Sequence, residues 1–399
     1  MVLRLGIPGV TETTATTGEA GTYATRMLLA VSLGWAVLQT GRFLLSPLLP
    51  TIIEDLGITE ATAGLALAAF QGVYAVTQYP GGEYSDNWNR TTLVVPGLAV
   101  LVVGFLLFGV ATSLATFLVA AVVVGLGKGL FAIPSRALLS DLFTARRGRA
   151  LGIYAAGTDV GGLVSSGIAV LALTYATWRT PFLPVAVALA VVTVLYAVWT
   201  REGFRVGSPS LDAVGTVRRL VASSEQRETL VAFSLFYFMV GGFINFFPTY
   251  LAQARGFSDG LASATFAVVF VVGLGIKPLA GGLGDRYSRR GIAVAGLLLG
   301  AAALTGLVLA TSRIALLAAT VAMAAGYKTG FPLADAIIMD DAPTDGMGAD
   351  LGAARALFLA ANALGPAYVG VVVTYGTYAH AFGGFVVCLL VAAALLLRG

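Results

Sequence analysis

Long apolar stretches, each followed by a short polar segment, recur along the whole chain. The stretch 91–111 has no charged residue and exceeds the roughly 18 apolar residues that indicate a membrane-spanning helix. Twelve stretches of this kind occur, so the sequence predicts an all-α membrane protein with twelve transmembrane helices. We place them at 27–50, 61–82, 91–112, 115–138, 149–173, 180–199, 229–252, 262–284, 291–311, 314–338, 350–374 and 378–397.

The composition agrees with this pattern, because 58% of the 399 residues are hydrophobic and only 11% are charged. A soluble domain carries roughly 25% charged residues. Twelve spans of about 20 residues occupy about 240 positions, so the remaining chain forms loops, two termini and one connector. A folded catalytic domain outside the membrane is therefore excluded, and we expect no enzymatic activity.

The distribution of charge and the scarcity of cysteine and histidine exclude several other classes of function. The net charge of +4 is spread between apolar segments rather than gathered on one polar face, so no nucleic-acid partner is expected. The single cysteine, Cys388, and the single histidine, His380, exclude an internal disulfide, a metal cluster and a histidine-based triad. Residues 127–129 lack the spacing of a nucleotide-binding P-loop. We therefore expect no metal and no cofactor, with the lipid bilayer and a small solute as partners.

The distribution of arginine predicts how the helices are oriented. If the N-terminus is cytoplasmic, fifteen arginines lie inside and only Arg179, Arg255 and Arg313 lie outside. This bias predicts a protein of the plasma (inner) membrane with both termini in the cytoplasm. We expect a monomer with a cytoplasmic polar tail at 1–24, a six-helix bundle at 25–200, a cytoplasmic connector at 201–228 and a second six-helix bundle at 229–399.

An internal repeat supports the division into two bundles. The segment around Lys128 matches the segment around Lys328 at a constant offset of 200 residues, and residues 82–86 match residues 281–285 at an offset of 199. Both repeats run in the same direction through the membrane. Parallel six-helix repeats joined by a connector are typical of one class of secondary transporters, in which the two halves rock about a site near the midplane.

The loops after the second and eighth predicted spans resemble the signature of the major facilitator superfamily. The second copy matches the signature at five positions between Gly281 and Arg290, whereas the first copy, which begins at Gly82, departs from it at three positions. The resemblance covers essentially the whole chain. It implies a fold of twelve transmembrane helices in two pseudo-symmetric six-helix bundles.

The resemblance also implies a conformational latch. In the family, the aspartate and the arginine of this loop engage the acidic end of the fourth or tenth helix and close the cytoplasmic side of the outward-open state. Such a latch needs contacts that break at a cost of only a few kcal/mol. The alternative is that these charges only set the orientation of the helices. The corresponding residues here are Asp86, Arg90, Asp141, Asp285, Arg289 and Asp341.

Two further motifs concern the solute and the direction of coupling. The run from Arg42 to Pro80 resembles the anion:cation symporter group, whose members carry organic anions. Residues 157–162 in the fifth span resemble a motif of antiporters, with Thr158 in the place of a proline. Coupling to protons and exchange for a second anion therefore both remain open.

Six cations lie inside the predicted spans, and all three lysines of the chain are among them. An unpaired cation at mid-membrane costs at least about 2.5 kcal/mol, so these side chains are expected to line a cavity. Two acids, Asp159 and Asp335, accompany them at depth. Helical-hairpin geometry predicts that Arg136 pairs with Asp159 and that Arg355 pairs with Asp335. These pairs either hold helices in place or act as gates and proton sites.

The other four cations, Arg42, Lys128, Lys277 and Lys328, then lack a counter-ion inside the membrane, and an anionic substrate is the simplest candidate for it. Lys128 and Lys328 lie roughly 15 Å from both interfaces, too far for their side chains to reach water. The polar side chains that we expect to bind the substrate with them, rather than only to join helices, are Tyr74, Gln78, Asn245 and Asn362.

We therefore predict a carrier that moves a small organic anion by alternating access, coupled to protons or to anion exchange. For proton coupling, Asp335 is the candidate, because Lys328 lies seven residues before it on the same helix face. A drug:proton antiporter is one alternative, although four cavity cations disfavour cationic drugs. A membrane receptor with a carrier fold that does not transport is the other.

Overall fold

The structure is a computed structural model that describes residues 13–206, 224–341 and 347–398. All regular elements in these residues are helices. The first half of the chain forms α1 (Thr13–Leu56), α2 (Glu60–Val76), α3 (Gln78–Asn87), α4 (Arg90–Gly109), α5 (Leu114–Leu142), α6 (Arg147–Tyr175) and α7 (Phe182–Trp199). The second half forms α9 (Ser224–Thr249), α10 (Asp259–Arg286), α11 (Arg289–Leu309), α12 (Arg313–Asp341), α13 (Met347–Tyr375) and α14 (Tyr378–Arg398).

The described helices account for twelve membrane crossings. Eleven are long and apolar enough to span a membrane by themselves. The remaining crossing is divided between α2 and α3 at Thr77, whose hydroxyl donates to the carbonyls of Val73 at 3.0 Å and Tyr74 at 2.9 Å. Such bonds from a threonine to the preceding turn often bend a helix. The predicted all-α fold with twelve transmembrane helices is confirmed.

The first helix differs from the predicted first span, 27–50, because it begins at Thr13. No proline occurs between residues 13 and 46, so the helix of the apolar span can extend into the polar residues that precede it. Part of the segment expected to be a polar tail, 1–24, is therefore helical. Residues 1–12 of that segment lie outside the described residues.

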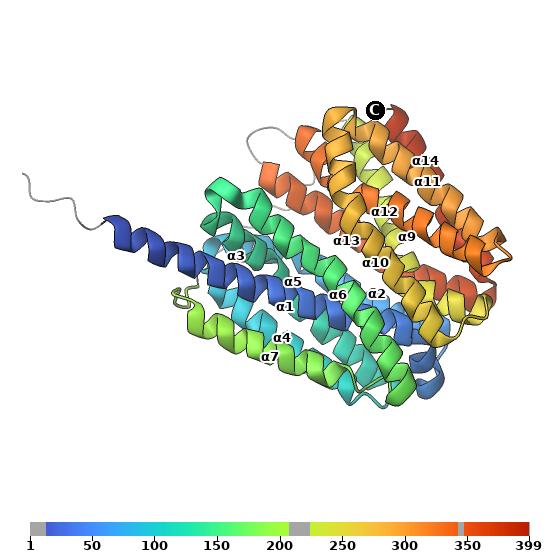
Figure 1. Ribbon diagram of the computed structural model, residues 1–399, viewed down its shortest axis with the longest axis horizontal. Helices are drawn as coiled ribbons and strands as arrows, with labels where there is room; N and C mark the ends of the chain where they lie inside the picture. Colours follow the sequence, from blue (N-terminus) through green and yellow to red (C-terminus); the bar gives the residue numbers. More distant parts are fainter. Residues whose placement is uncertain (1–12, 207–223, 342–346, 399) are drawn as a thin grey trace, which may run out of the picture.

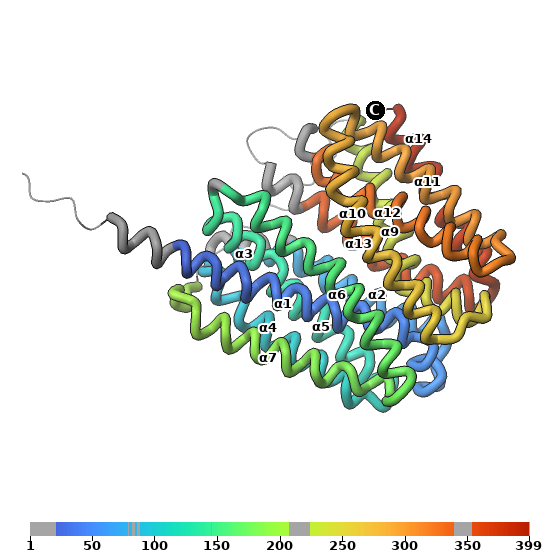
Figure 2. The backbone as a smooth tube through the Cα atoms, in the orientation of Figure 1, coloured from blue at the N-terminus to red at the C-terminus, as the bar shows by residue number. Residues whose placement is uncertain are grey.

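Two bundles stand side by side, one built from α1 to α7 and the other from α9 to α14 (Figure 1 and Figure 2). In the first bundle, α4 packs on α5 and α7, and α1 packs on α6. In the second, α11 packs on α12 and α14, and α9 packs on α13. The bundles meet mainly where α2 packs on α13 and where α6 packs on α10.

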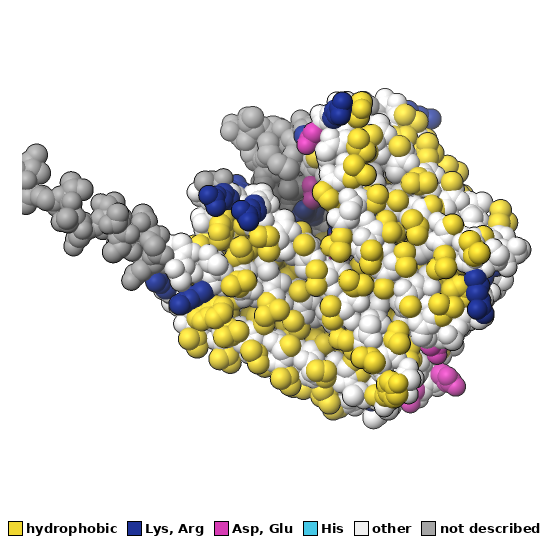
Figure 3. All heavy atoms as spheres, viewed as in Figure 1, with side chains coloured by type: hydrophobic (Ala, Val, Ile, Leu, Met, Phe, Trp, Pro, Cys, Tyr) yellow, Lys and Arg dark blue, Asp and Glu magenta, His cyan; other side chains and the backbone are white. Residues whose placement is uncertain are grey.

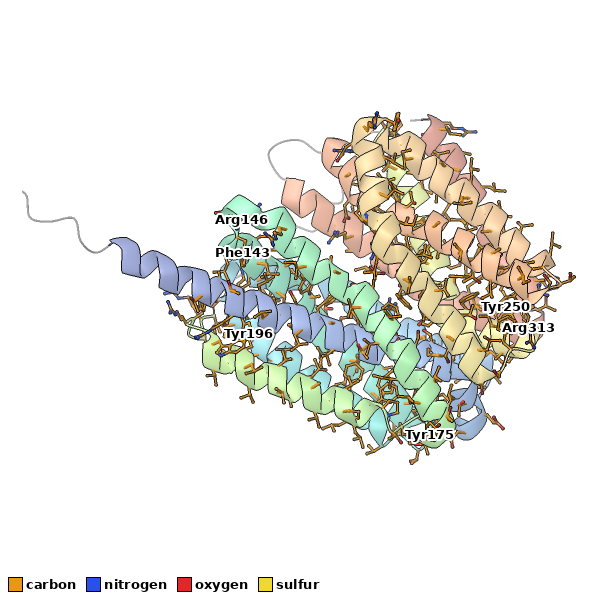
Figure 4. The ribbon with its side chains drawn as sticks, viewed as in Figure 1. Phe143, Arg146, Tyr175, Tyr196, Tyr250 and Arg313 are labelled. Carbon is orange, nitrogen blue, oxygen red and sulfur yellow. The ribbon has the colours of Figure 1, made fainter. Side chains whose placement is uncertain are left out.

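The two ends of the bundles carry different parts of the chain. We call the end at which α7 finishes and α9 begins the connector end, and the opposite end the far end. Figure 4 shows Phe143 and Arg146 at the connector end, and Tyr250 and Arg313 at the far end. Between the ends, Figure 3 shows a face covered mainly by hydrophobic side chains, with the charged side chains gathered near the ends. This surface is suited to lipid along its middle and to water at its ends.

The bundles are in direct contact toward the far end. The backbone N–H of Ala61 in α2 donates to Thr374 Oγ1 in α13 at 3.0 Å. One turn further along α2, a Cβ added to Gly64 would lie 2.4 Å from the carbonyl oxygen of Pro366, so only glycine permits this approach. The α2–α13 contact therefore closes the gap between the bundles at the far end.

Candidate functional site

A cavity of about 660 Å³ lies between the two bundles. It is lined by α1, α2, α3, α5 and α6 of the first bundle and by α9, α10, α12 and α13 of the second. The contributions of α6, residues 152–159, and of α13, residues 355–362, come from the part of each helix nearer the connector end. The cavity therefore extends from the middle of the molecule toward the connector end, where Figure 3 shows charged side chains in the hollow between the bundles.

Most of the residues predicted for the site are brought together in this cavity. Asn245 is not among its lining residues, because its side-chain amide donates to the Gly241 carbonyl at 2.7 Å within α9. In this structure Asn245 is therefore not placed at the cavity, and its contact with the substrate stays a prediction. The predicted residues that line the cavity are Arg42, Tyr74, Gln78, Lys128, Arg136, Asp159, Lys277, Lys328, Asp335, Arg355 and Asn362.

Both polar atoms of the Asn362 side-chain amide form hydrogen bonds within the protein. Its Oδ1 accepts from Gln71 Nε2 at 2.5 Å, and its Nδ2 donates to the Tyr237 carbonyl at 2.9 Å. Gln71 lies on α2 and Asn362 on α13, so this contact joins the two bundles beside the cavity. Asn362 connects the bundles as well as facing the cavity.

Apart from Tyr74, the sequence analysis did not predict the aromatic side chains that line the cavity. Trp35, Phe331 and Phe358 line it. Aromatic residues are common in apolar spans, so their presence carries little information. One signal was available, because Phe331 follows Lys328 by three residues, and Phe358 follows Arg355 by three, which places each pair on one helix face.

The carboxylate of Asp159 bridges two lysines of the opposite bundle. Its Oδ1 accepts from Lys328 Nζ at 2.6 Å, and its Oδ2 accepts from Lys277 Nζ. The predicted pair of Arg136 with Asp159 is therefore wrong. The guanidinium of Arg136 lies instead over the ring of Trp35, 5.5 Å from its centroid. The prediction failed because it considered hairpin neighbours within one bundle, whereas the partners of Asp159 lie across the seam between bundles.

Glycines bring Asp159 to this seam. A Cβ on Gly161 would lie 2.7 Å from the Ala36 carbonyl oxygen of α1, so α6 packs closely on α1 there. A Cβ on Gly162 would lie 2.2 Å from the ring of Phe270 in α10. A Cβ on Gly273 would lie 2.8 Å from Asp159 Oδ1, so this glycine leaves the space in which the carboxylate meets the lysines. The glycine motif at 157–162 thus places one carboxylate between the bundles.

The second predicted ion pair is confirmed. Arg355 Nε donates to Asp335 Oδ1 at 2.9 Å, and its Nη2 donates to Asp335 Oδ2. Two parallel bonds of this kind give an arginine–carboxylate pair a fixed geometry. The side chain of Asp335 is 29% exposed and that of Arg355 is 33% exposed. Both belong to the second bundle, so this pair does not cross the seam.

Lys128 has an aromatic environment without a carboxylate. It is 4% exposed, and its Nζ lies 3.8 Å from the ring centroid of Tyr74 and 5.2 Å from that of Phe70. Gln71 Oε1 is 3.5 Å away, a long contact for a hydrogen bond. Among the described residues no carboxylate forms a salt bridge with it. Cation–π contacts supply part of the stabilisation that an anion would give.

Arg42 and Arg136 also lack a carboxylate partner in the described part of the chain. The guanidinium of Arg42 lies 4.5 Å from the ring centroid of Phe43, and its Nε is buried without a hydrogen-bond partner. With Lys128 they form a group of three cations on the first bundle, which we call the open cation group. Among the described residues that line the cavity are six cationic and two acidic side chains, which give it a formal surplus of four positive charges.

The predicted latch is described only in part. Arg90 Nε lies 3.2 Å from Asp141 Oδ2, so the predicted contact in the first bundle is present. In the second bundle, Arg289 Nη2 lies 2.8 Å from Asp285 Oδ1 within the same loop. The side chains of Asp86 and Asp341 lie outside the described residues. Whether these contacts act as a latch stays a prediction.

The sequence matches the profile of the Major Facilitator Superfamily over residues 31–281 and 229–399. Among solved structures, a bacterial homolog of the human lysosomal transporter Spinster, in an inward-facing and occupied conformation, superposes with a TM-score of 0.81 at 18% identity. The superposition covers 94% of this chain and 96% of that one. At this identity the likeness concerns the fold alone.

Three curated relatives show what kinds of protein share this sequence pattern. A protein of Cupriavidus necator named as a probable sulfoacetate transporter is 27% identical over 258 residues, so the match spans 60% of this chain and 60% of that relative. The hexuronate transporter of Bacillus subtilis is 25% identical over 384 residues, which cover 89% of this chain and 90% of the relative. Multidrug resistance protein D of Escherichia coli is 26% identical over 250 residues, covering 62% of each.

Proposed function

Because the chain belongs to the major facilitator superfamily, we propose that it is a secondary active transporter that moves a small organic anion by alternating access. The chain is a multi-pass membrane transporter, and its relatives are transporters rather than enzymes. Two relatives are named for sulfoacetate and for hexuronate, which are both organic anions. These names and the charges of the cavity support the same class of solute independently.

The environment of Lys128 is the observation that carries this proposal. Lys128 and Lys328 are related by the internal repeat, and each lies over a phenylalanine that is related in the same way, Phe70 and Phe270. Lys328 has Asp159 as its counter-ion, whereas Lys128 has none in the described residues. A cation at this depth costs at least about 2.5 kcal/mol if it stays unpaired. We infer that the anion of the solute takes the place beside Lys128 that Asp159 takes beside Lys328.

The cavity is suited to a small solute. A volume of about 660 Å³ falls within the range of ordinary small-molecule sites, which is about 300–1,000 Å³. Tyr74 and Gln78 face the cavity beside Lys128 and can donate hydrogen bonds to a carboxylate or a sulfonate. Arg42 can bind such a group through two parallel N–H groups, which adds geometric selectivity.

A drug:proton antiporter is the main alternative, and both the motif at 157–162 and the relative named for multidrug resistance favour it. A free carboxylate in the cavity would favour binding of a cationic drug. The two carboxylates that line the cavity, Asp159 and Asp335, are bonded to lysine and arginine. The surplus of positive charge would repel a cation. The cavity charges therefore favour an anion over a cationic drug.

The remaining features of the proposal concern orientation and coupling. The arginine bias supports a plasma-membrane protein with both termini in the cytoplasm, so the cavity would face the cytoplasm in the state described here. Coupling is either to protons, with Asp335 and Asp159 as the candidate carboxylates, or to the exchange of a second anion. We propose that a single chain is the transporting unit.

Binding of anions to the purified protein tests this function. We expect that carboxylates or sulfonates of small size raise the melting temperature of the wild type, because a ligand at 100 times its Kd adds about 2.7 kcal/mol of stability. Lys128→Gln should lose most of this shift. A matched control is Arg313→Gln, which removes an exposed cation at the far end and should keep the full shift.

Two results would contradict the proposal. One is a wild-type protein that no small anion stabilises, which would favour the receptor or the drug antiporter. The other is a Lys128→Gln protein that is stabilised as much as the wild type, which would remove the residue on which the proposal depends.

A further inference from the structure

One carboxylate connects the two halves of the molecule inside the cavity. Asp159 belongs to α6 of the first bundle, and its lysine partners belong to α10 and α12 of the second. The Asp159 side chain is 1% exposed, that of Lys328 is 3% exposed and that of Lys277 is 26% exposed. Lys277 is therefore the member of this bridge that an ion in the cavity would meet first.

The bridge lies beside the contact that closes the seam between α6 and α10. Gly162, which touches Phe270, follows Asp159 by three residues, or about 4.5 Å along the helix. In alternating access the two halves of a transporter rock against each other. The bridge crosses the boundary between these halves, with Asp159 on α6 and its lysine partners on α10 and α12. A substrate that competes for the lysines would therefore act on a contact that joins the two bundles.

The cavity holds two sets of cations that an anion can occupy. The open cation group, Arg42, Lys128 and Arg136, has no carboxylate in the described residues. The other set, Lys277 and Lys328, is neutralised in part by Asp159. A solute with one anionic group can satisfy the first set. Because both sets line one cavity, a solute with two anionic groups is suited to contact the second set as well, where it would compete with Asp159.

We propose that Asp159 is a built-in competitor for the second anionic group of a dianionic substrate. This inference rests on the proposed anion transport and names its substrate class, a small organic dianion such as a dicarboxylate or a sulfocarboxylate. When the substrate binds, its second anionic group replaces Asp159 on Lys277 and Lys328. When the substrate leaves, Asp159 binds the two lysines again, which lowers the cost of release. Asp159 thus acts as a positioning and specificity residue.

The proposal predicts that Asp159→Asn increases the affinity for the substrate and decreases the rate of turnover. Without the competing carboxylate, a dicarboxylate should bind more tightly, by about tenfold, because it no longer displaces a charged partner. Release should slow by a similar factor, since nothing replaces the substrate on the lysines. The variant should therefore have a lower KM and a lower kcat for transport. A merely structural role would raise KM or reduce the amount of folded protein.

The experiment uses calorimetry on the full chain in detergent and uptake into proteoliposomes, with succinate and butyrate as matched probes. The wild type should bind succinate more tightly than butyrate. Asp159→Asn should increase the affinity for succinate more than that for butyrate. A control is Asp55→Asn, which removes a carboxylate that is bonded to Arg179 at 2.6 Å within the first bundle and should change neither affinity.

The experiment distinguishes a failure of the proposed anion transport from a failure of the competitor role of Asp159. If the wild type binds no small carboxylate and no small sulfonate, the proposed anion transport fails. If the wild type binds these acids and Asp159→Asn leaves the affinities unchanged or weakens them, only the competitor role fails. If Asp159→Asn does not fold, Lys277→Gln provides the test: it should remove the preference for succinate over butyrate, and a preserved preference overturns the proposal.

Discussion

At the residue scale, the two repeat-related lysines have the same kind of aromatic contact and different counter-ions. Both are buried, and each Nζ lies over a phenylalanine, at 5.2 Å for Lys128 and 4.8 Å for Lys328. The position that corresponds to Asp159 in the second half is 359, a leucine, so the repeat supplies a carboxylate for only one lysine. This asymmetry between the two lysines leaves Lys128 as a charged position for a solute.

Asp335 leads to a prediction about the charge of the cavity. Its carboxylate is bonded to Arg355, and its side chain is 29% exposed. The substitution Asp335→Asn removes one negative charge and leaves Arg355 without its counter-ion, which makes the cavity more positive. We expect this variant to bind an organic anion about tenfold more tightly than the wild type. Calorimetry on the two proteins at one pH measures this.

An Asp335→Asn protein that binds the anion no more tightly than the wild type would contradict this prediction. Transport measurements separate the two modes of coupling. If protons are coupled through Asp335, Asp335→Asn should still exchange anions across liposomes but lose accumulation driven by a pH gradient. A wild type that exchanges anions and shows no pH-driven uptake would favour anion exchange.

At the element scale, the hydrophobic pattern predicts the number of membrane-spanning helices but not the contacts between them. Uncharged stretches predicted twelve crossings, because a span needs about 20 apolar residues whatever its neighbours are. The Asp335–Arg355 pair was predicted because both residues flank one turn, 20 residues apart. The partners of Asp159 lie 118 and 169 residues away in the sequence, so they depend on how α6 packs on α10 and α12. No pattern within one hairpin contains that information.

The contact between α4 and α5 at the connector end leads to a prediction about rates. Arg90, at the start of α4, bonds Asp141 at the end of α5. This contact lies outside the cavity. We therefore expect Arg90→Ala to slow transport while the Kd of the anion stays within a few-fold of the wild type. Flux into liposomes and calorimetry measure the two quantities.

A suitable control is Arg146→Ala, which removes an exposed arginine at the same end and should leave the flux unchanged. The latch role of Arg90 is contradicted if Arg90→Ala weakens binding strongly while its maximal rate of transport stays normal.

At the scale of the whole molecule, the closed end and the charged cavity lie in different parts of the fold. The α2–α13 contact closes the far end, Phe270 packs against Gly162 near the middle of α10 and α6, and the cavity extends toward the connector end. The formal surplus of positive charge lies in the middle, at the seam between the two bundles. A solute that neutralises this charge binds where both halves touch it, so its binding can favour one arrangement of the bundles over the other.

The most direct test of the central claim is transport by reconstituted protein. Liposomes that contain the wild type are given a radiolabelled form of the anion that raises the melting temperature most, and uptake is measured with and without an internal counter-anion. The account predicts uptake well above that of protein-free liposomes, and its loss in Lys128→Gln but not in Arg313→Gln. Uptake equal to that of protein-free liposomes, or equal in the wild type and Lys128→Gln, would contradict the account.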